Sequence, residues 1–246
     1  MTDQDARIAW VTGGGTGIGK AGAAALAADG WTVIISGRRG DALDEAAAGI
    51  ADEGGRIEAL TLDVSDAADA QDVADEIVRR HGRIDLLVNS AGVNIRKRGW
   101  SDMDLDGWNT VVDINLTGLY HCMRAVLPTM RAQQDGCVIN IASWAGRFVS
   151  KVSGAAYTTV KHGVVALTHS FNQEEFRNGL RACCICPAEV ATEIMKQRPV
   201  PVSDEDLARM LQPDDLGRTI AFVANMPRHV CVNEVLISPT WNRSYL

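Results

Sequence analysis

The sequence predicts an α/β fold: a doubly wound, parallel, seven-stranded sheet with helices on both faces, formed by residues 1–246 as one domain. Short β-branched runs alternate with longer stretches of helical periodicity, which is the pattern of β-α-β units. The runs are almost continuously apolar, as expected of strands that helices cover on both faces. The seven expected strands span residues 8–12, 32–36, 57–62, 84–89, 137–142, 181–186 and 230–237.

Helical segments fill the intervals between these strands. Residues 19–29 follow the first strand and residues 67–81 follow the third. A long helical region, 103–133, follows the fourth strand, and residues 157–178 follow the fifth. A helix between two parallel strands carries the chain back to where the next strand begins, so each segment completes a crossover.

The interval 192–213, between the sixth strand and the last helix, is the most irregular part of the chain. It contains Pro199, Pro201 and Pro213 within a charged stretch. Long loops in compact domains often have a function, so we expect a mobile flap that contributes to substrate binding. The alternative is a passive surface loop.

The composition is that of an ordinary globular protein, because 46% hydrophobic and 22% charged residues exclude a disordered chain. No apolar run approaches the roughly 18 residues that a membrane-spanning helix needs. The first ten residues lack the basic and apolar regions of a secretory signal. We therefore expect a cytoplasmic protein without a membrane partner.

Charge and cysteine content exclude two further classes. The net charge is −7, and no cluster of Lys and Arg is long enough to neutralise a run of phosphates, so nucleic acid is not an expected partner. The six cysteines lie in apolar segments without the paired CxxC spacing of zinc sites. We expect them to be small buried apolar side chains, and we expect no metal site, even at the cysteine-rich segment 183–186.

A glycine-rich segment, TGGGTGIG at residues 12–19, joins the first strand to the first helix. In this context glycines let backbone N–H groups approach a pyrophosphate at the N-terminus of a helix. The pattern fits TGxxxGxG better than the GxGxxG formed by Gly17, Gly19 and Gly22, whose last glycine falls inside the helix. The alternative interpretation is a tight strand-to-helix turn without a ligand.

The residues after the second strand bear on which dinucleotide is bound. An acidic residue at this position would accept hydrogen bonds from the ribose 2′-hydroxyl of NAD, but the chain reads Ser36-Gly37-Arg38-Arg39. Two guanidinium groups suit a 2′-phosphate through charge-assisted bonds. The sequence therefore favours NADP(H), with NAD(H) possible; the alternative is a solvated basic turn.

Four polar residues suggest a catalytic group. Tyr157 and Lys161 are four residues apart, so they project from one face of a helix. An ammonium group at this distance lowers the pKa of a phenol. The alternative is an ordinary pair of side chains on the protein surface. Ser143 follows the fifth strand, at the edge where open α/β sheets bind ligands. Asn115 lies in mid-helix, where its side chain competes for backbone hydrogen bonds, so we expect a specific contact to hold it.

Together these motifs resemble the compact branch of the short-chain dehydrogenase/reductase family, with members such as 3-oxoacyl-carrier-protein reductases, and the resemblance covers nearly the whole chain. It implies a Rossmann-like fold and a catalytic tetrad of Asn115, Ser143, Tyr157 and Lys161. The cofactor residues that the motifs and the resemblance indicate are Gly13, Gly15, Thr16, Gly17, Ile18, Gly19, Arg38, Arg39, Asp63, Val64, Asn89, Ala91, Gly92, Tyr157, Lys161, Pro187, Val190 and Thr192.

The chain departs from the family pattern at three positions. Residues 89–92, after the fourth strand, match the family's NNAG motif, but Ser90 replaces its second Asn, a small polar exchange. Residues 187–192 match the family's PGxVxT segment, but Ala188 replaces its glycine and would be strained if that position required a positive φ. Thr16 stands where many NADP-dependent members have a basic residue, so Arg38 and Arg39 carry the cofactor preference.

The resemblance implies hydride transfer between the nicotinamide and a carbonyl or secondary alcohol of a small substrate. Tyr157 is the expected general acid or base, and Lys161 would lower the pKa of Tyr157 and bind the nicotinamide ribose. Ser143 would stabilise the oxyanion that develops on the substrate, and Asn115 would hold a water molecule of the proton relay. Because the NADP pool of a cell is usually in the reduced form, carbonyl reduction is the expected direction of the reaction. The alternative function is a non-catalytic dinucleotide-binding regulator or scaffold on the same fold.

Position along the chain indicates the substrate pocket, for which we expect contacts from Asn94, Trp144, Glu189 and Met195. Four basic loop residues could favour an anionic substrate such as a keto acid; they are Arg96, Lys97, Arg98 and Arg147.

Family members assemble as homo-oligomers, and a dimer or tetramer is expected here. The tail, 239–246, contains two aromatic residues and should pack on a neighbouring subunit, close over the pocket or fold back on its own subunit.

Overall fold

The computed structural model describes residues 6–245, except for the side chain of Ser244. Seven strands form one sheet in the order β3-β2-β1-β4-β5-β6-β7, and every pair of neighbours is parallel. The strands are β1 (Ile8–Thr12), β2 (Thr32–Gly37), β3 (Arg56–Thr61), β4 (Leu86–Asn89), β5 (Gly136–Ile141), β6 (Leu180–Pro187) and β7 (Glu234–Ile237). The predicted doubly wound sheet is confirmed.

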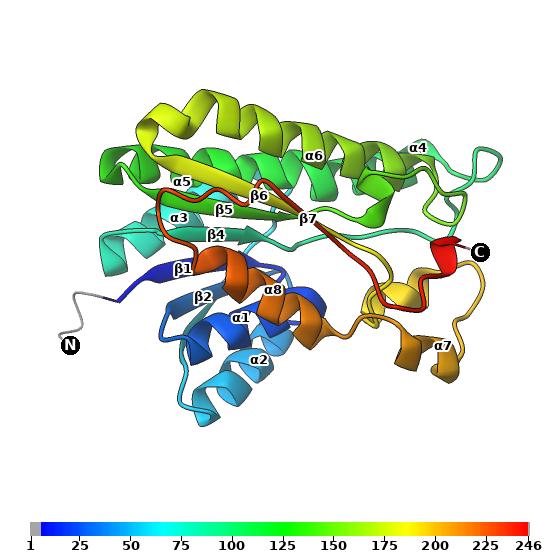
Figure 1. The fold of residues 1–246 in the computed structure, drawn as a ribbon, viewed down its shortest axis with the longest axis horizontal. Helices are drawn as coiled ribbons and strands as arrows, with labels where there is room; N and C mark the ends of the chain where they lie inside the picture. Colours follow the sequence, from blue (N-terminus) through cyan, green and yellow to red (C-terminus); the bar gives the residue numbers. More distant parts are fainter. Residues whose placement is uncertain (1–5, 246) are drawn as a thin grey trace.

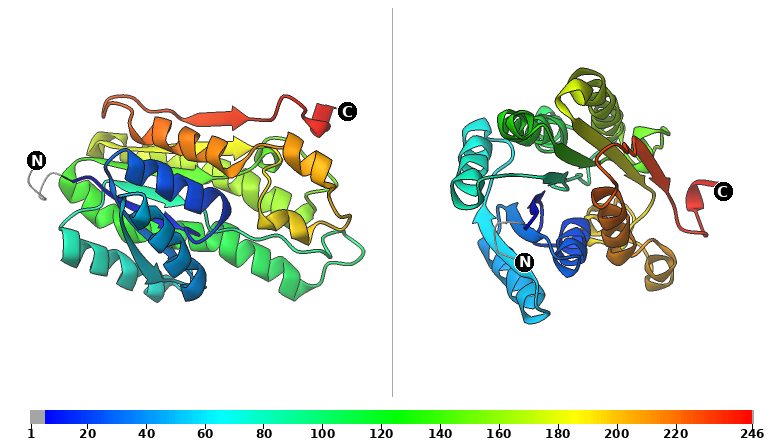
Figure 2. Two further views of the ribbon diagram at one scale, coloured as in Figure 1. Left: turned by 90° about the horizontal axis from the view of Figure 1, so that it is seen from below. Right: turned by 60° about the vertical axis from the view of Figure 1, so that its left-hand side comes forward.

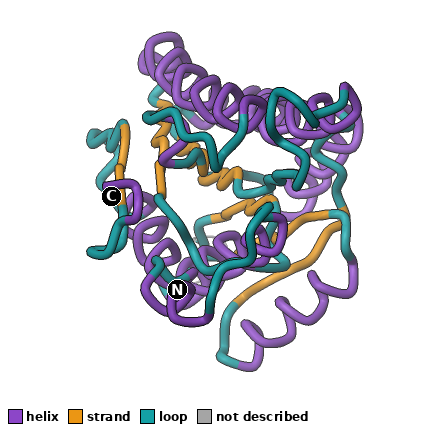
Figure 3. Tube along the Cα trace, turned by 90° about the vertical axis from the view of Figure 1, so that its right-hand side faces the viewer, coloured by secondary structure: helices purple, strands orange, loops and turns teal. Residues whose placement is uncertain are grey.

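Helices cover both faces of the sheet, as Figures 1 and 3 show. One core joins the sheet to α3 (Ala67–His81), α5 (Gly118–Gln133) and α6 (Ala155–Glu175). The other joins it to α1 (Gly17–Ala28), α2 (Gly40–Asp52) and α8 (Pro213–Ala224). Successive residues of β1 alternate between the two cores, as the period of a strand requires.

The long helical region predicted for 103–133 is not one helix. It consists of α4 (Leu105–Val112), a π-helical turn over Asp113–Thr117 and α5. The π turn contains Asn115, so the polar residue that looked out of place in a regular helix lies where the helix widens.

Two other segments differ from the sequence-based expectation. The last strand is shorter than 230–237, because only Glu234–Ile237 pairs with β6. The expected flap contains a 3₁₀ turn, Glu193–Gln197, and a short helix, α7 (Asp204–Arg209), rather than irregular chain alone. In α7 the Ser203 hydroxyl accepts a hydrogen bond from the Asp206 N–H, which explains why a helix begins there.

The cysteine expectation holds at five positions and is wrong at one. Cys231 is exposed, because it lies before β7 in a segment that does not join the sheet, whereas the other five cysteines are buried. Within residues 6–245 there is no group of three metal-ligating side chains. No helix in the same part of the chain is long and apolar enough to cross a membrane.

The strands point towards the end of the molecule that carries α4, α7 and the C-terminus (Figure 1). Beyond the carboxyl ends of the strands lies a cavity of about 1140 Å³. The connections after β1, β2, β4, β5 and β6 all contribute to its lining. It lies where the order of the sheet reverses between β1 and β4, the usual ligand position in such sheets.

Candidate active site

The glycine loop forms one end of the cavity. Thr12 closes β1, and its hydroxyl accepts hydrogen bonds from the backbone N–H groups of Ser90 and Ala91, which joins the loop to the segment after β4. Gly13 has a φ of +66°, and a Cβ there would lie 2.8 Å from the Ala91 backbone. A Cβ on Gly19 would lie 2.3 Å from the Gly13 carbonyl oxygen. The backbone is therefore packed too closely for side chains at either position.

The loop fits the pyrophosphate of a dinucleotide. Helix α1 begins at Gly17, within the glycine-rich segment, and its N-cap residue, Thr16, makes no side-chain capping bond to the first turn. The first-turn N–H groups of a helix then lack acceptors, and they favour an anion. The glycine motif therefore leaves backbone donors available for an anion, which favours the ligand-binding interpretation over a tight turn.

The end of β2 places two arginines at the cavity. Arg38 and Arg39 are exposed and both line it. Arg39 donates to the Thr16 hydroxyl at 3.3 Å and pairs with Glu193 of the flap at 3.4 Å. Nearby, hydrogen bonds from Ser65, assisted by the Arg38 charge, hold the pKa of Asp63 below its usual value.

Asn115 is held by the backbone, as expected. Its Oδ1 accepts from the Val93 N–H, and its Nδ2 donates to the carbonyl oxygens of Val93 (2.9 Å) and Val111 (2.8 Å). The side chain is almost completely buried and does not line the cavity. Asn115 therefore fixes the segment that follows β4 against the π turn.

Ser143, Tyr157 and Lys161 all line the cavity, and the Ser143 side chain is hydrogen-bonded to Tyr157. Lys161 donates to the Ile141 carbonyl oxygen at 2.9 Å, and its Nζ lies 5.4 Å from the centroid of the Tyr157 ring. Ser143 follows β5, and its Oγ accepts from the Ala145 N–H at 3.1 Å. The surface-pair interpretation of Tyr157 and Lys161 is wrong, because Lys161 is only 4% exposed.

Burial dominates the electrostatics of this group. It lowers the pKa of Lys161 to about 8, because the interior disfavours an ammonium. Burial also raises the pKa of Tyr157, against the opposing effects of the Ser143 hydroxyl and the guanidinium groups of Arg98 and Arg198. The lowered phenol pKa that the sequence led us to expect is thus not found, because desolvation outweighs the neighbouring charges.

The other end of the cavity is formed by the flap, the segment before α6 and the C-terminal tail. Asn94, Trp144, Glu189 and Met195 all line the cavity, as predicted from their positions. Asn94 is fixed by a bond to the Ser153 carbonyl oxygen, and the Trp144 ring stacks on Phe148 with centroids 4.6 Å apart.

The carboxylate of Glu189 is already paired, which the sequence did not reveal. Arg198 of the flap binds it, and Arg243 of the tail donates to both of its oxygens at 2.7 and 2.8 Å. Arg243 also donates to Asp206 of α7. These partners lie 9 to 54 residues from Glu189 in the chain, beyond the reach of any local pattern.

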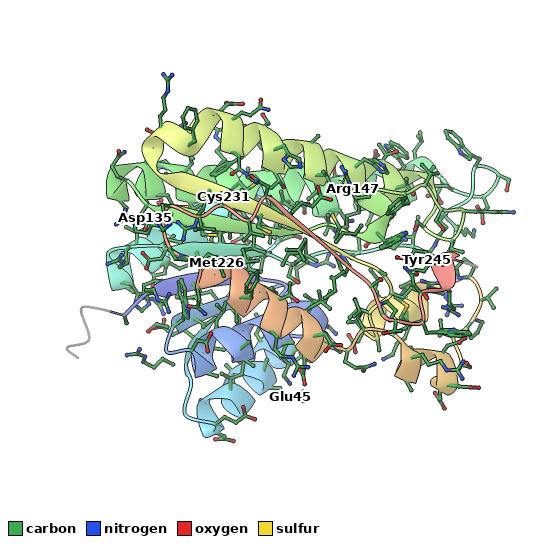
Figure 4. The ribbon with its side chains drawn as sticks, in the orientation of Figure 1. Glu45, Asp135, Arg147, Met226, Cys231 and Tyr245 are labelled. Carbon is green, nitrogen blue, oxygen red and sulfur yellow. The ribbon has the colours of Figure 1, made fainter. Side chains whose placement is uncertain are left out.

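The tail folds back on its own chain beside the cavity. Besides the Arg243 bonds, the Tyr245 ring lies edge-on to Trp144 with centroids 5.8 Å apart. Figure 4 shows Tyr245 at the end of the molecule where α7 lies, and Arg147 apart from it.

Among the four basic residues considered for substrate binding, Arg98 alone lines the cavity. Arg147 pairs with Glu234 of β7, and Arg96 donates to the Lys196 carbonyl oxygen.

Comparison with known proteins identifies the family. The model of the family described as short chain dehydrogenase matches residues 7–201. This chain belongs to the short-chain dehydrogenase family. Its similarity to other members extends well beyond the matched residues, as the following relatives show.

An uncharacterized oxidoreductase of Staphylococcus haemolyticus is 31% identical over 97% of this chain and 100% of its own length. A 3-oxoacyl-[acyl-carrier-protein] reductase of Synechocystis is 35% identical over 92% of each chain. Among solved structures, the actinorhodin polyketide ketoreductase with NADPH is 28% identical, with a TM-score of 0.89 over 99% of this chain and 100% of its own. The predicted family, fold and oxidoreductase class are confirmed.

In this short-chain dehydrogenase most of the residues predicted for the site line one cavity. The exceptions are Gly19, Asn89 and Asn115, which lie behind the lining. Asn89 is buried and donates to the Asn140 side chain. Ala188 is not strained, because Gln134 is the one non-glycine residue with a positive φ in the described part of the chain.

Proposed function

We propose that this short-chain dehydrogenase is an NADP(H)-dependent carbonyl reductase of small molecules, with Tyr157 as the general acid. The observation that carries the proposal is the meeting of Ser143, Tyr157 and Lys161 in the cavity that also contains the glycine loop. When bound, NADP(H) supplies a hydride from its nicotinamide, or accepts one in the reverse direction.

The protein groups divide the remaining work. The raised pKa of Tyr157 keeps its phenol protonated at neutral pH, so it is ready to donate a proton to a carbonyl oxygen. The Ser143 hydroxyl stabilises charge on the same oxygen. Lys161 is held one helical turn from Tyr157, where its ammonium can bind the nicotinamide ribose. Asn115 maintains the backbone between β4 and α4.

The Tyr157→Phe variant tests this assignment. It removes the proton donor and keeps the ring, so we expect turnover to fall by about 10² to 10⁴-fold while NADPH affinity is unchanged. NADPH oxidation with a panel of ketones, keto esters, keto acids and sugars measures turnover, and fluorescence titration measures affinity. Tyr120→Phe, on the exposed side of α5, is the matched control.

An active Tyr157→Phe enzyme would refute the assignment. NADPH binding without turnover of any substrate would favour the regulator function.

We further propose that Arg38 and Arg39 give preference for NADP(H) over NAD(H). Their position at the end of β2 supports contact with a 2′-phosphate. Replacing both by Leu should lower kcat/KM for NADPH about 10 to 100-fold, the usual effect of losing hydrogen bonds to a charged group, and leave kcat/KM for NADH nearly unchanged. An equal loss with both cofactors would contradict the proposal. Arg177→Leu, on the far side of the fold at the end of α6, is the control.

A further inference from the structure

Arg98 is a buried guanidinium group at the substrate end of the cavity. It is only 7% exposed, and it donates to three backbone carbonyl oxygens, those of Ile95 (2.6 Å), Val152 (3.2 Å) and Gln197. A guanidinium carries five N–H hydrogens, so the side chain retains donors beyond these bonds. Within the described residues no carboxylate pairs with it.

Such an arrangement is costly unless the charge has a use. Removing a cation from water is expensive, and carbonyl dipoles offset only part of the cost. The location of Arg98 in the lining therefore indicates that its charge acts on what enters the cavity.

A second guanidinium group lies in the same lining. Arg198 comes from the flap, and its carboxylate partner, Glu189, is shared with Arg243. Arg243 has Asp206 as its other partner. Arg198 and Arg243 thus share two carboxylates, and Arg98 adds a third guanidinium group that has none, which leaves a positive excess here in a chain whose net charge is −7.

This excess reaches the reacting group. Both Arg98 and Arg198 oppose the effect of burial on the pKa of Tyr157, so both guanidinium groups lie close enough to stabilise negative charge at its hydroxyl. Apolar side chains from Trp144, Ile194 and Met195 complete the wall. A small carbonyl compound with an anionic group a few bonds from the carbonyl fits this combination of charge and apolar surface.

We propose that the substrate is an oxo acid whose carboxylate binds between Arg98 and Arg198 while its carbonyl lies at Tyr157 and Ser143. This proposal rests on the proposed function. The carbonyl carbon accepts the hydride of NADPH, the π electrons pass to the oxygen, and that oxygen takes the proton of Tyr157. The products are a hydroxy acid and NADP⁺, and the carboxylate is unchanged.

The first experiment compares acids with their neutral esters. The rate of NADPH oxidation is measured with 3-oxobutanoate and 4-oxopentanoate and with the methyl ester of each. Loss of charge-assisted bonds to the carboxylate should make kcat/KM at least about tenfold lower for the ester than for the acid. An ester reduced as efficiently as its acid would overturn the proposal and leave the proposed function standing.

Variants assign the preference to the two arginines. Arg98→Met and Arg198→Met should each lower kcat/KM for the acids about 10 to 100-fold, mainly by raising KM. The same variants should change kcat/KM for the esters little. Lys97→Met removes a charge from the exposed surface next to Arg98 and should change neither. Since Arg98→Met removes bonds to three segments, Arg198→Met decides the test if the Arg98→Met protein does not fold. Equal losses with acids and esters in the Arg198→Met variant would overturn the proposal.

A binding measurement separates this proposal from the catalytic one. Calorimetric titration of the protein, with and without NADP⁺, uses 3-hydroxybutanoate and its methyl ester as probes. Tighter binding of the acid, lost in Arg198→Met, supports the anion site even if no carbonyl compound is reduced. Binding of the ester as tight as that of the acid, or binding of neither, would overturn it.

Discussion

Tyr157 and Lys161 show how burial changes what a pair of residues does. From their spacing alone, the ammonium was expected to lower the phenol pKa. In the folded chain Lys161 is nearly inaccessible, and its ammonium is directed to the Ile141 carbonyl oxygen. Both groups lose hydration, so the pKa of Tyr157 rises and that of Lys161 falls to about 8. Each group is shifted towards its neutral form.

The lysine shift predicts a pH-dependent stability. Between pH 8 and 10.5 the unfolded chain retains the Lys161 proton and the folded chain does not, so stability rises with pH in this window. Relative to Lys161→Met, the free energy of unfolding should increase by about 3 kcal/mol between pH 7 and pH 10.5, at about 1.36 kcal/mol for each pH unit. Urea denaturation of both proteins checks this. A difference in the free energy of unfolding between the wild type and Lys161→Met that stays constant with pH would contradict the prediction.

The flap and the tail are elements that meet at one carboxylate. Glu189 follows β6, Arg198 follows the 3₁₀ turn of the flap, and Arg243 belongs to the last 3₁₀ turn, Arg243–Tyr245. Asp206 adds α7 through its bond with Arg243. Glu189 therefore links two segments that cover the substrate end of the cavity, rather than binding the substrate by itself.

Replacing Glu189 by Gln should loosen both segments together. The amide cannot neutralise two guanidinium groups, and removing one partner of a half-buried ion pair leaves the others uncompensated. We expect amide hydrogen exchange about tenfold faster in 193–211 and 240–245, with unchanged exchange in the sheet, and a higher KM for the substrate. Glu205→Gln is the control, since Glu205 pairs with Arg209 within α7 and is mostly exposed. Faster exchange in only one of the two segments would disprove the link.

At the scale of the whole molecule, the sheet is covered on both faces, but its β7 edge is open, as Figure 2 shows. Leu236 of β7 and Phe222 of α8 are about half exposed. Exposed apolar side chains at an open sheet edge favour association. The tail, in contrast, contacts its own chain through Arg243 and Tyr245.

This contrast predicts the behaviour of a chain truncated after Ser238. We expect light scattering to give a homodimer or homotetramer for both the full and the truncated chain, because the tail contacts its own subunit. The kcat/KM of the truncated enzyme should nevertheless be lower by about tenfold or more. Without Arg243, Glu189 loses two hydrogen bonds, and Arg198, which Glu189 binds, is positioned less precisely. A truncated chain that dissociates to monomers with normal kinetics would show that the tail belongs to a subunit interface instead.

The sheet, the glycine loop and the order of the candidate catalytic residues could all be predicted from the sequence. These features depend on local spacing: apolar runs define the strands, and parallel strands bring their carboxyl ends to one edge. Ser143, Tyr157 and the glycines are placed by the strands and helices that contain them, so their meeting could be predicted.

Which charged side chains pair with one another depends on the folded chain and could not be predicted. Arg98 and Gln197 are bonded across 99 residues, and Arg243 reaches Glu189 across 54. Nothing in the local sequence distinguishes Arg98 from its neighbours Arg96 and Lys97, of which the first is exposed and bonds elsewhere. The directions in which the pKa values of Tyr157 and Lys161 shift could not be predicted either, because they depend on burial, and burial results from the packing of several elements. Spacing along the chain fixes periodicity and connection, whereas charge pairing and desolvation depend on distances in space.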